Sequence, residues 1–212
     1  MMKLIKAIAF IGILFTIGCK DSYFTDGGAK PADQSGNLGV STMDYLESHR
    51  ESFDTLARLI RLTKLEDEVN AQGNTFFAPR DYSIHNYFKL IYPDPQNTPA
   101  TLEAIPQEDM DRIAAIIKNY IIPGDEIVRN DLATTYSYAT TSGDTKARFN
   151  VVTSDYLGNV NLGAKFIMFS LNVSPAGATE RYQSVQVVTA DLRSTNGVVH
   201  ILNSDTHIFG FN

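Results

Sequence analysis

The sequence is poor in cysteine and has no excess of positive charge. A single cysteine among 212 residues excludes an internal disulfide framework and a zinc site built from several cysteines. The 18 Lys and Arg are outnumbered by 24 Asp and Glu, which gives a net charge of −6. We therefore expect no nucleic acid partner, because binding to phosphates needs clustered cations.

Signatures of common catalytic sites are also missing. The sequence has no G-x-S-x-G, P-loop, G-x-G-x-x-G or H-E-x-x-H motif. Of its four histidines, His200 and His207 are close enough in sequence to share a metal, although a histidine bonded to the backbone is the commoner case. We predict no catalytic residue, no metal ligand and no cofactor, and therefore a protein that is not an enzyme.

What the sequence does contain is the composition of a globular domain. Hydrophobic residues make up 43% of the chain and charged residues 20%, with ten Tyr and twelve Phe, enough for a sizeable core. Some tyrosines fall in expected loops or strand edges, where their rings can stack on sugars or can pack at the edge of the core. These are Tyr136, Tyr138, Tyr156 and Tyr182.

The start of the chain is typical of an export signal that ends at a cysteine. Lys3 and Lys6 precede an uncharged, mostly apolar run over residues 7–18. This run is too short to span roughly 30 Å of hydrocarbon, which takes about 20 residues, so it predicts a signal peptide. The run ends at Gly18-Cys19, which resembles a bacterial lipoprotein signal. We expect Cys19 to carry the lipid; the alternative is an ordinary signal peptide with an incidental cysteine.

Three regions are predicted from this start. Residues 1–18 are the signal peptide, residues 19–40 a flexible tether rich in Gly, Asp, Ser and Lys, and residues 41–212 the folded domain. Asp21, soon after the cysteine, resembles the surface-export tethers of Bacteroidetes-type lipoproteins. We therefore expect an exported outer-membrane lipoprotein whose domain faces the cell exterior.

The folded part begins with helical patterns. Ser41 or Thr42 can cap a helix, and a buried stripe at helical spacing follows from Phe53 to Ile60. After a short apolar strand at residues 75–78, further helices are predicted over residues 82–92 and from about Gln107. Pro106 suits the first turn of the latter, and Pro123-Gly124 is expected to end it.

From about Thr134 the pattern changes to strands. They are predicted over residues 145–152, 166–173, 182–190, 197–202 and 206–211, and the nearly continuous apolar run 166–173 suggests burial on both faces. Helices followed by strands predict the α+β class, here one domain with N-terminal helices packed on a mostly antiparallel β-wedge or sandwich.

Three ordered segments resemble the signatures of fasciclin domains. Residues 74–81, NTFFAPRD, are similar to the first signature, a T-x-F-A-P strand and turn followed by an acidic or amide residue. Residues 116–124, IIKNYIIPG, are similar to the middle segment, which closes with Pro-Gly. Residues 191–202, DLRSTNGVVHIL, are similar to the last signature, an A-x-N-G-V-x-H-V stretch. The resemblance covers about Ser41 to Phe211, nearly all of the expected domain.

The resemblance assigns structural roles to the matching residues. They are Thr75, Phe77, Ala78, Pro79, Asp81, Pro123, Gly124, Asn196, Gly197 and His200. We expect Pro79 to end the strand and Asp81 to cap the next helix. Asn196-Gly197 is expected to supply a tight turn with positive φ. His200, on the face opposite to Val199 and Ile201, is expected to bond back toward the turn at residues 77–79.

Two departures from the family pattern affect function. Asn119 and Tyr120 stand where the family usually has a Tyr-His pair, so receptor contacts proposed for that pair transfer poorly. The proline-rich stretch from Tyr92 to Pro106 looks like an insertion. This stretch and the loop from Thr134 to Asp144 are the least generic regions, and we expect ligand contacts there first.

Taken together, these features predict a lipid-anchored, non-enzymatic binding or adhesion module of fasciclin type on a bacterial envelope, with a protein or glycan ligand at the cell surface. One alternative is an accessory in glycan capture beside an outer-membrane polysaccharide importer. The other is a purely structural envelope protein of the periplasm, held by its lipid.

Overall fold

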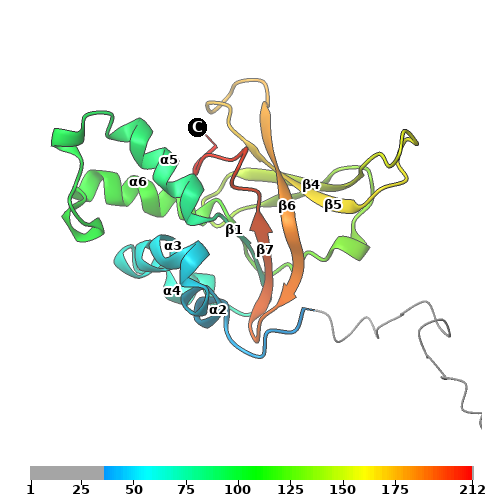
Figure 1. Ribbon diagram of the computed structural model, residues 1–212, viewed down its shortest axis with the longest axis horizontal. Helices are drawn as coiled ribbons and strands as arrows, with labels where there is room; N and C mark the ends of the chain where they lie inside the picture. The colour runs from blue at the N-terminus through cyan, green and yellow to red at the C-terminus, as the bar shows by residue number, and fades with distance from the viewer. Residues whose placement is uncertain (1–35, 212) are drawn as a thin grey trace, which may run out of the picture. The chain divides into compact units, whose positions relative to one another are not determined.

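Helices come first in the chain and strands afterwards, as the sequence predicts (Figure 1). The computed structural model describes residues 36–211; the predicted signal peptide, Cys19 and most of the predicted tether lie outside them. The helices are α2 (Thr42–Ser48), α3 (Arg50–Leu62), α4 (Glu66–Val69), α5 (Asp81–Ile91) and α6 (Gln107–Lys118), with the 3-10 turns η2 (Pro95–Asn97), η3 (Leu102–Ala104) and η4 (Arg129–Asp131). The strands are β1 (Asn74–Ala78), β2 (Ile121–Ile122), β3 (Ser137–Thr140), β4 (Lys146–Thr153), β5 (Lys165–Asn172), β6 (Tyr182–Arg193) and β7 (Gly197–Leu202).

Local sequence explains where the helices begin and which face they bury. Ser41 caps α2 in a capping box with Asp44, each side chain accepting the other residue's backbone N–H. Helix α3 buries the predicted stripe, including Phe53 and Ile60. Pro106 lies at the N-cap of α6, one position before the expected first turn. The helices gather on one side of the sheet (Figure 1).

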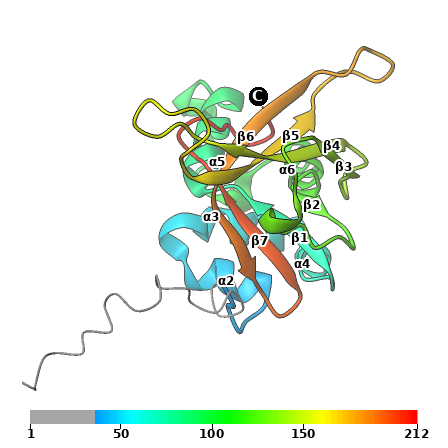
Figure 2. The ribbon, with the colours of Figure 1, turned by 90° about the vertical axis from the view of Figure 1, so that its right-hand side faces the viewer.

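The seven strands form one sheet in the order β2-β1-β7-β6-β5-β4-β3 (Figure 2). All neighbouring pairs are antiparallel except β1 and β7, which pair in parallel from Asn74↔Gly197 to Ala78↔Ile201. Strand β6 belongs to both halves of the sheet, and its pairing with β7 shifts register between Val187 and Leu192. Such bulges bend a strand and increase its twist.

The core lies between the two halves of the sheet and under the helices. Phe77 is fully buried there, and its ring stacks on Phe169 at a centroid distance of 4.1 Å and on Phe149 at 6.3 Å. Strand β1 is buried along its whole length, because β2 and β7 flank it. The predicted α+β wedge is therefore confirmed, with a single seven-stranded, mostly antiparallel sheet.

Four details of the sequence prediction are wrong. Residues 206–211 form turns and not a strand, and their buried residues Phe209 and Phe211 pack as a plug. Strand β5 is not covered on both faces, because Phe166 and Met168 are only half-buried. Helix α6 ends at Lys118, so Pro123-Gly124 ends the short strand β2 instead.

The start of the folded domain also differs from the prediction. The expected tether reaches residue 40, yet residues 36–40 already pair with the end of β6 and the turn after it. Leu38 N–H donates to the Arg193 carbonyl at 2.8 Å, and Arg193 N–H donates to the Gly36 carbonyl at 2.7 Å. Thr195 N–H donates to the Val40 carbonyl at 2.9 Å. Residues 36–40 therefore belong to the folded unit, which includes Gly36 and does not begin at Ser41.

Candidate functional site

The signature residues of the first segment are buried and hold a loop. Thr75 is fully buried; its hydroxyl donates to the Asp125 carbonyl at 2.6 Å and accepts the Ile127 N–H at 2.8 Å. The neighbouring Asn74 accepts the Gly124 N–H at 2.9 Å. The loop after β2 is therefore fixed from β1, because buried polar groups need such partners. Sequence analysis missed Asn74, although it directly precedes the signature threonine.

His200 of strand β7 also holds the loop after β2. Its hydrogen-bond partner is not the one expected from the sequence. Its imidazole bonds the Ile127 carbonyl at 2.9 Å, and not the turn at residues 77–79. The second ring nitrogen, Nδ1, accepts the Asp191 N–H at 3.2 Å, so Nε2 carries the proton and donates it to Ile127. His200 is fully buried, and burial lowers the pKa of its imidazole. It is a structural histidine.

Gly197 and Asn196 do not supply the expected positive φ. Neither is among the residues with positive φ. Gly197 is needed because a Cβ there would lie 2.1 Å from the Asn74 carbonyl oxygen in the parallel β1–β7 pair. The Asn196 side chain accepts the Thr42 N–H at 2.8 Å and ties the start of α2 to this turn.

Asp81 also acts differently from the expectation. The N-cap of α5 is Arg80, which makes no side-chain cap bond, and Asp81 is the first residue of the helix. The Asp81 carboxylate reaches across to α3, where it accepts the N–H groups of Thr55 and Leu56 at 2.9 and 3.0 Å. Asp81 thus ties two helices together. Its carboxyl pKa is raised because burial disfavours the charge.

Tyr120 and His207 form a second buried polar pair. The Tyr120 hydroxyl lies 2.8 Å from His207 Nε2 and accepts the Gly210 N–H at 2.8 Å. Burial lowers the pKa of His207 to about 4, so the ring is neutral at pH 7. His207 therefore pins the C-terminal turn to the core, and the pairing of His200 and His207 on one metal is not what the structure shows.

Within residues 36–211, no group of three or more His, Cys, Asp or Glu side chains is arranged to hold a metal ion. No helix in the described part of the chain is both long and apolar enough to cross a membrane.

Several tyrosine rings and one arginine lie together on the outer face of β3, β4 and β6. The Arg148 guanidinium is stacked between two tyrosine rings, 3.9 Å from the Tyr136 centroid and 4.1 Å from the Tyr182 centroid. Tyr138, opposite Arg148 in the β3–β4 register, is 62% exposed. We call Tyr136, Tyr138, Arg148 and Tyr182 the Tyr-Arg cluster. Tyr and Arg are among the residues enriched at binding hot spots, although Arg148 and Tyr182 are here half-buried. Tyr156 is also exposed but is not part of this cluster.

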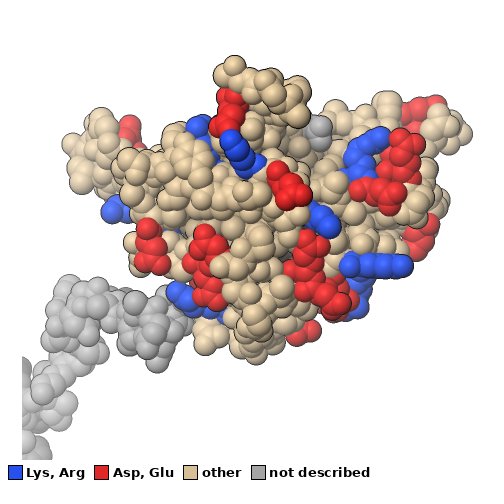
Figure 3. Space-filling model, turned by 180° about the vertical axis from the view of Figure 1, so that it is seen from behind, with Lys and Arg blue, Asp and Glu red and all other residues tan. Residues whose placement is uncertain are grey.

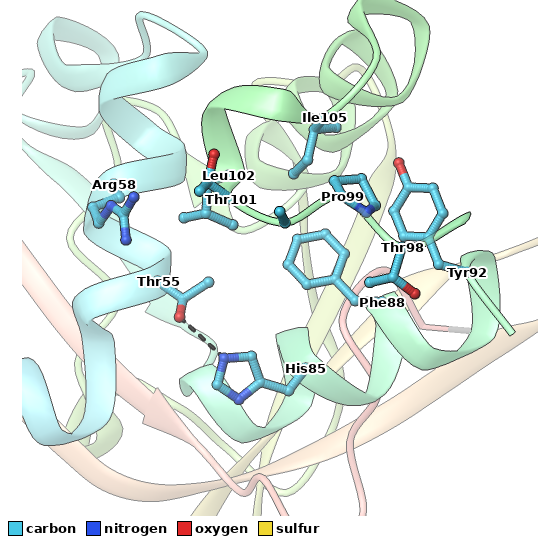
Figure 4. Close-up of a pocket in the computed structure, with 11 residues that line it drawn as sticks. Thr55, Arg58, His85, Phe88, Tyr92, Thr98, Pro99, Thr101, Leu102 and Ile105 are labelled. Atoms are coloured by element: carbon cyan, nitrogen blue, oxygen red, sulfur yellow. Dashed lines mark hydrogen bonds between the residues drawn. The ribbon is translucent and has the colours of Figure 1, made fainter. Parts of the chain in front are cut away.

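The proline-rich segment 92–106 builds the wall of a cavity (Figure 4). The cavity has a volume of about 330 Å³ and lies between this segment and helices α3 and α5. Phe88, Pro99 and Leu102 give it apolar surface, and Thr55, Arg58 and His85 give it polar groups. We call it the insertion cavity. The sequence prediction placed ligand contacts on this segment, but not on the helices that face it.

Hydrogen bonds fix the segment that forms this wall. Glu103 pairs with Arg58 of α3 at 2.7 Å, and the Tyr92 hydroxyl donates to Asp109 of α6 at 2.6 Å. Asp94 caps η2 by accepting the Gln96 N–H at 2.9 Å. Because Tyr92 near the start and Glu103 near the end are bonded to helices, the wall is built into the fold.

Charges elsewhere on the surface are mixed. Acidic and basic side chains lie beside one another over the face in Figure 3. Ion pairs such as Arg112–Asp109 and Arg129–Asp191 join charges of opposite sign on the protein surface. A surface of mixed sign with a net charge of −6 does not favour nucleic acid.

Fold and site together define an α+β domain whose motif residues build the core and whose contact chemistry lies outside it. The chain belongs to the fasciclin domain family: the family model matches residues 51–204. Domains of this family are generally non-enzymatic and related to adhesion. Among curated proteins no match was found.

Solved structures also contain similar chains. One is described as "Novel Fold Revealed by the Structure of a FAS1 Domain Pair from the Insect Cell Adhesion Molecule Fasciclin I". It is 19% identical, with a TM-score of 0.48 over 74% of this chain. This chain spans 45% of that structure's length.

Proposed function

We propose that this chain is a non-enzymatic binding and adhesion module, held at the outer surface of a bacterial envelope by a lipid on Cys19. The observation that carries the proposal is family membership over residues 51–204. The order of segments before the domain supports the placement, because a short apolar run, a lone cysteine and a polar stretch precede Gly36. Several acyl chains on Cys19 would anchor the chain firmly.

The internal chemistry of the described domain supports binding over catalysis. His200 and His207 are buried, and their ring nitrogens bond Ile127, Asp191 and Tyr120. These groups therefore hold the fold. The exposed Tyr-Arg cluster and the insertion cavity are the surfaces suited to a ligand.

The test is protease shaving of intact cells that express the full chain. We expect cleavage of the wild-type domain without lysis, and release of Cys19→Ala from the membrane fraction. Thr16→Leu is the matched control, because it places at that position the leucine that lipoprotein signals usually carry; it should stay membrane-bound. A wild-type domain protected until the outer membrane is opened would refute surface adhesion and favour a structural role in the periplasm.

A second candidate function is capture of glycans beside an outer-membrane polysaccharide importer. Aromatic rings beside polar groups favour it, both at the Tyr-Arg cluster and at Phe88 of the insertion cavity, because rigid rings suit flat, hydroxylated ligands. Loss of growth on a polysaccharide after deletion of the chain, with adhesion unchanged, would favour this function over adhesion.

A further inference from the structure

The insertion cavity has the shape and chemistry of a small-ligand site. Its volume of about 330 Å³ lies at the lower end of ligand cavities, which span roughly 300 to 1,000 Å³. It is open to solvent on one side, so a ligand can be one unit of a longer molecule. A cavity of this size suits a single ring better than a polymer segment.

The lining has an apolar part and a polar part. Figure 4 shows the Phe88 ring in the middle, with Thr55 and His85 toward one end and Tyr92 and Pro99 toward the other. The Thr55 hydroxyl lies 3.2 Å from His85 Nε2. A ligand that fits must therefore offer both a flat apolar face and hydrogen-bonding groups.

The charges around the cavity favour a neutral ligand. The one guanidinium in the lining, Arg58, is already paired with Glu103 at 2.7 Å. The nearby Asp81 carboxylate accepts the Thr55 and Leu56 N–H groups. An anion at Arg58 would have to compete with Glu103, and among the described residues no carboxylate lines the cavity to hold a cation. A neutral hydroxyl group can accept from the remaining N–H groups of Arg58.

We propose that the insertion cavity binds one neutral pyranose residue of a glycan. The apolar face of the sugar ring lies on Phe88, and its hydroxyls bond Arg58 and Thr55. This inference rests on the proposed function, since it gives the binding module its ligand class. It also places sugar recognition at the insertion cavity and not at the Tyr-Arg cluster.

The test is ligand-observed saturation-transfer NMR on the full chain. The chain is purified in a zwitterionic detergent, because a maltoside detergent would itself present sugar. The probes are galactose, mannose, glucose and N-acetylglucosamine, with glucuronate and benzoate as charged counterparts. We expect saturation by at least one neutral sugar with a Kd on the order of 1 mM. Binding of the charged probes alone would overturn the proposal.

Variants of the cavity lining test whether the sugar binds in the insertion cavity. Phe88→Leu keeps apolar volume but removes the ring, and Arg58→Met keeps the apolar stem but removes the guanidinium; each should weaken sugar binding at least about tenfold. Arg61→Met is the matched control on α3, because Arg61 pairs with Glu47 and Glu66 and does not line the cavity. Thermal unfolding of each variant shows that the fold is intact.

A control on the other surface separates the two aromatic sites. Tyr138→Leu removes an exposed ring of the Tyr-Arg cluster and should leave sugar affinity within about twofold. Loss of binding in Tyr138→Leu but not in Phe88→Leu would overturn the proposal. The proposed function can fail separately: a protected domain in shaving that still binds sugar would refute surface display and leave the site standing.

Discussion

His200 and Phe77 face each other across the parallel pair of β1 and β7, with ring centroids 5.1 Å apart. Phe77 belongs to the first family signature and His200 to the last. The two segments are therefore neighbours in space, and together with Thr75 they fix the loop at Ile127. The first and last signatures of this chain therefore form one frame of packed core residues, and they are not separate motifs on the surface.

Replacing His200 tests this frame. His200→Leu keeps an apolar side chain but leaves the Ile127 carbonyl and the Asp191 N–H without their partner. We expect a loss of about 2 to 4 kcal/mol in the free energy of unfolding, measured by urea denaturation. The control is His85→Ala, which changes an exposed histidine and should cost under about 0.5 kcal/mol. Equal costs for the two variants would contradict the assignment.

His207 makes stability depend on pH. Its pKa is about 4 in the folded protein, below the ordinary value of 6.5, because the ring is buried. The unfolded chain therefore binds the proton more readily. Stability from this group is complete above pH 6.5, falls as the pH drops toward 4 and levels off below it. The full loss is on the order of 3 kcal/mol.

Chemical denaturation from pH 7.5 to 4 measures this dependence. His207→Leu should be less stable at pH 7, since the Tyr120 hydroxyl loses its partner, but its stability should fall less steeply between pH 6.5 and 4. Parallel curves for wild type and His207→Leu would show that the titration lies elsewhere.

Alanine substitutions at Gly197 and at Gly124 distinguish strain from a steric clash from strain caused by a positive φ. In Gly197→Ala the new methyl meets the Asn74 carbonyl oxygen at 2.1 Å, so the β1–β7 pair must move apart. We expect a cost of about 2 to 4 kcal/mol in thermal unfolding. Gly124 has φ of 65° and open space around it, so Gly124→Ala should cost only about 1 kcal/mol. The reverse order would contradict the close approach at Gly197.

Asp81 provides a test of the link between α5 and α3. Asp81→Ala removes both acceptors of the Thr55 and Leu56 N–H groups and should cost about 2 kcal/mol of unfolding free energy. Asp81→Asn keeps one acceptor oxygen and should recover about half of that loss. If Asp81 only capped α5, hydrogen exchange would increase at the start of α5 and not at Thr55 and Leu56 in α3.

Short-range patterns predicted most of the fold. The stripe of α3, the cap at Ser41 and the strand ended by Pro79 depend on residues within one or two turns of each other. The prediction for segment 206–211 failed because Phe209 and Phe211 alternate as in a strand but lie in turns, where their rings pack against Tyr120. Alternating apolar residues show which side chains are buried, whereas pairing with a neighbouring strand decides whether a strand forms.

The roles of the site residues were harder to predict, because their partners are distant in sequence. His200 finds its acceptor 73 positions away at Ile127, and nothing near His200 points there. The insertion cavity needs α3, α5 and segment 92–106 at once, so only its outer wall was foreseen. The sequence predicted that position 197 needs a glycine, but for the wrong reason. A positive φ was expected there, whereas the structure shows a close approach of the backbone, and both features select glycine.

The parallel pairing of β1 with β7 affects how the domain can form during synthesis. A chain that emerges N-terminus first delivers β1 more than a hundred residues before Gly197, its partner across the ladder. Until then one side of a strand that is buried along its whole length in the finished domain stays uncovered, and the loop at Ile127 has only one of its two supports. Closing so long a loop is slow, and the open edge is prone to aggregation. A holding chaperone would therefore be needed most in the interval between emergence of β1 and emergence of β7.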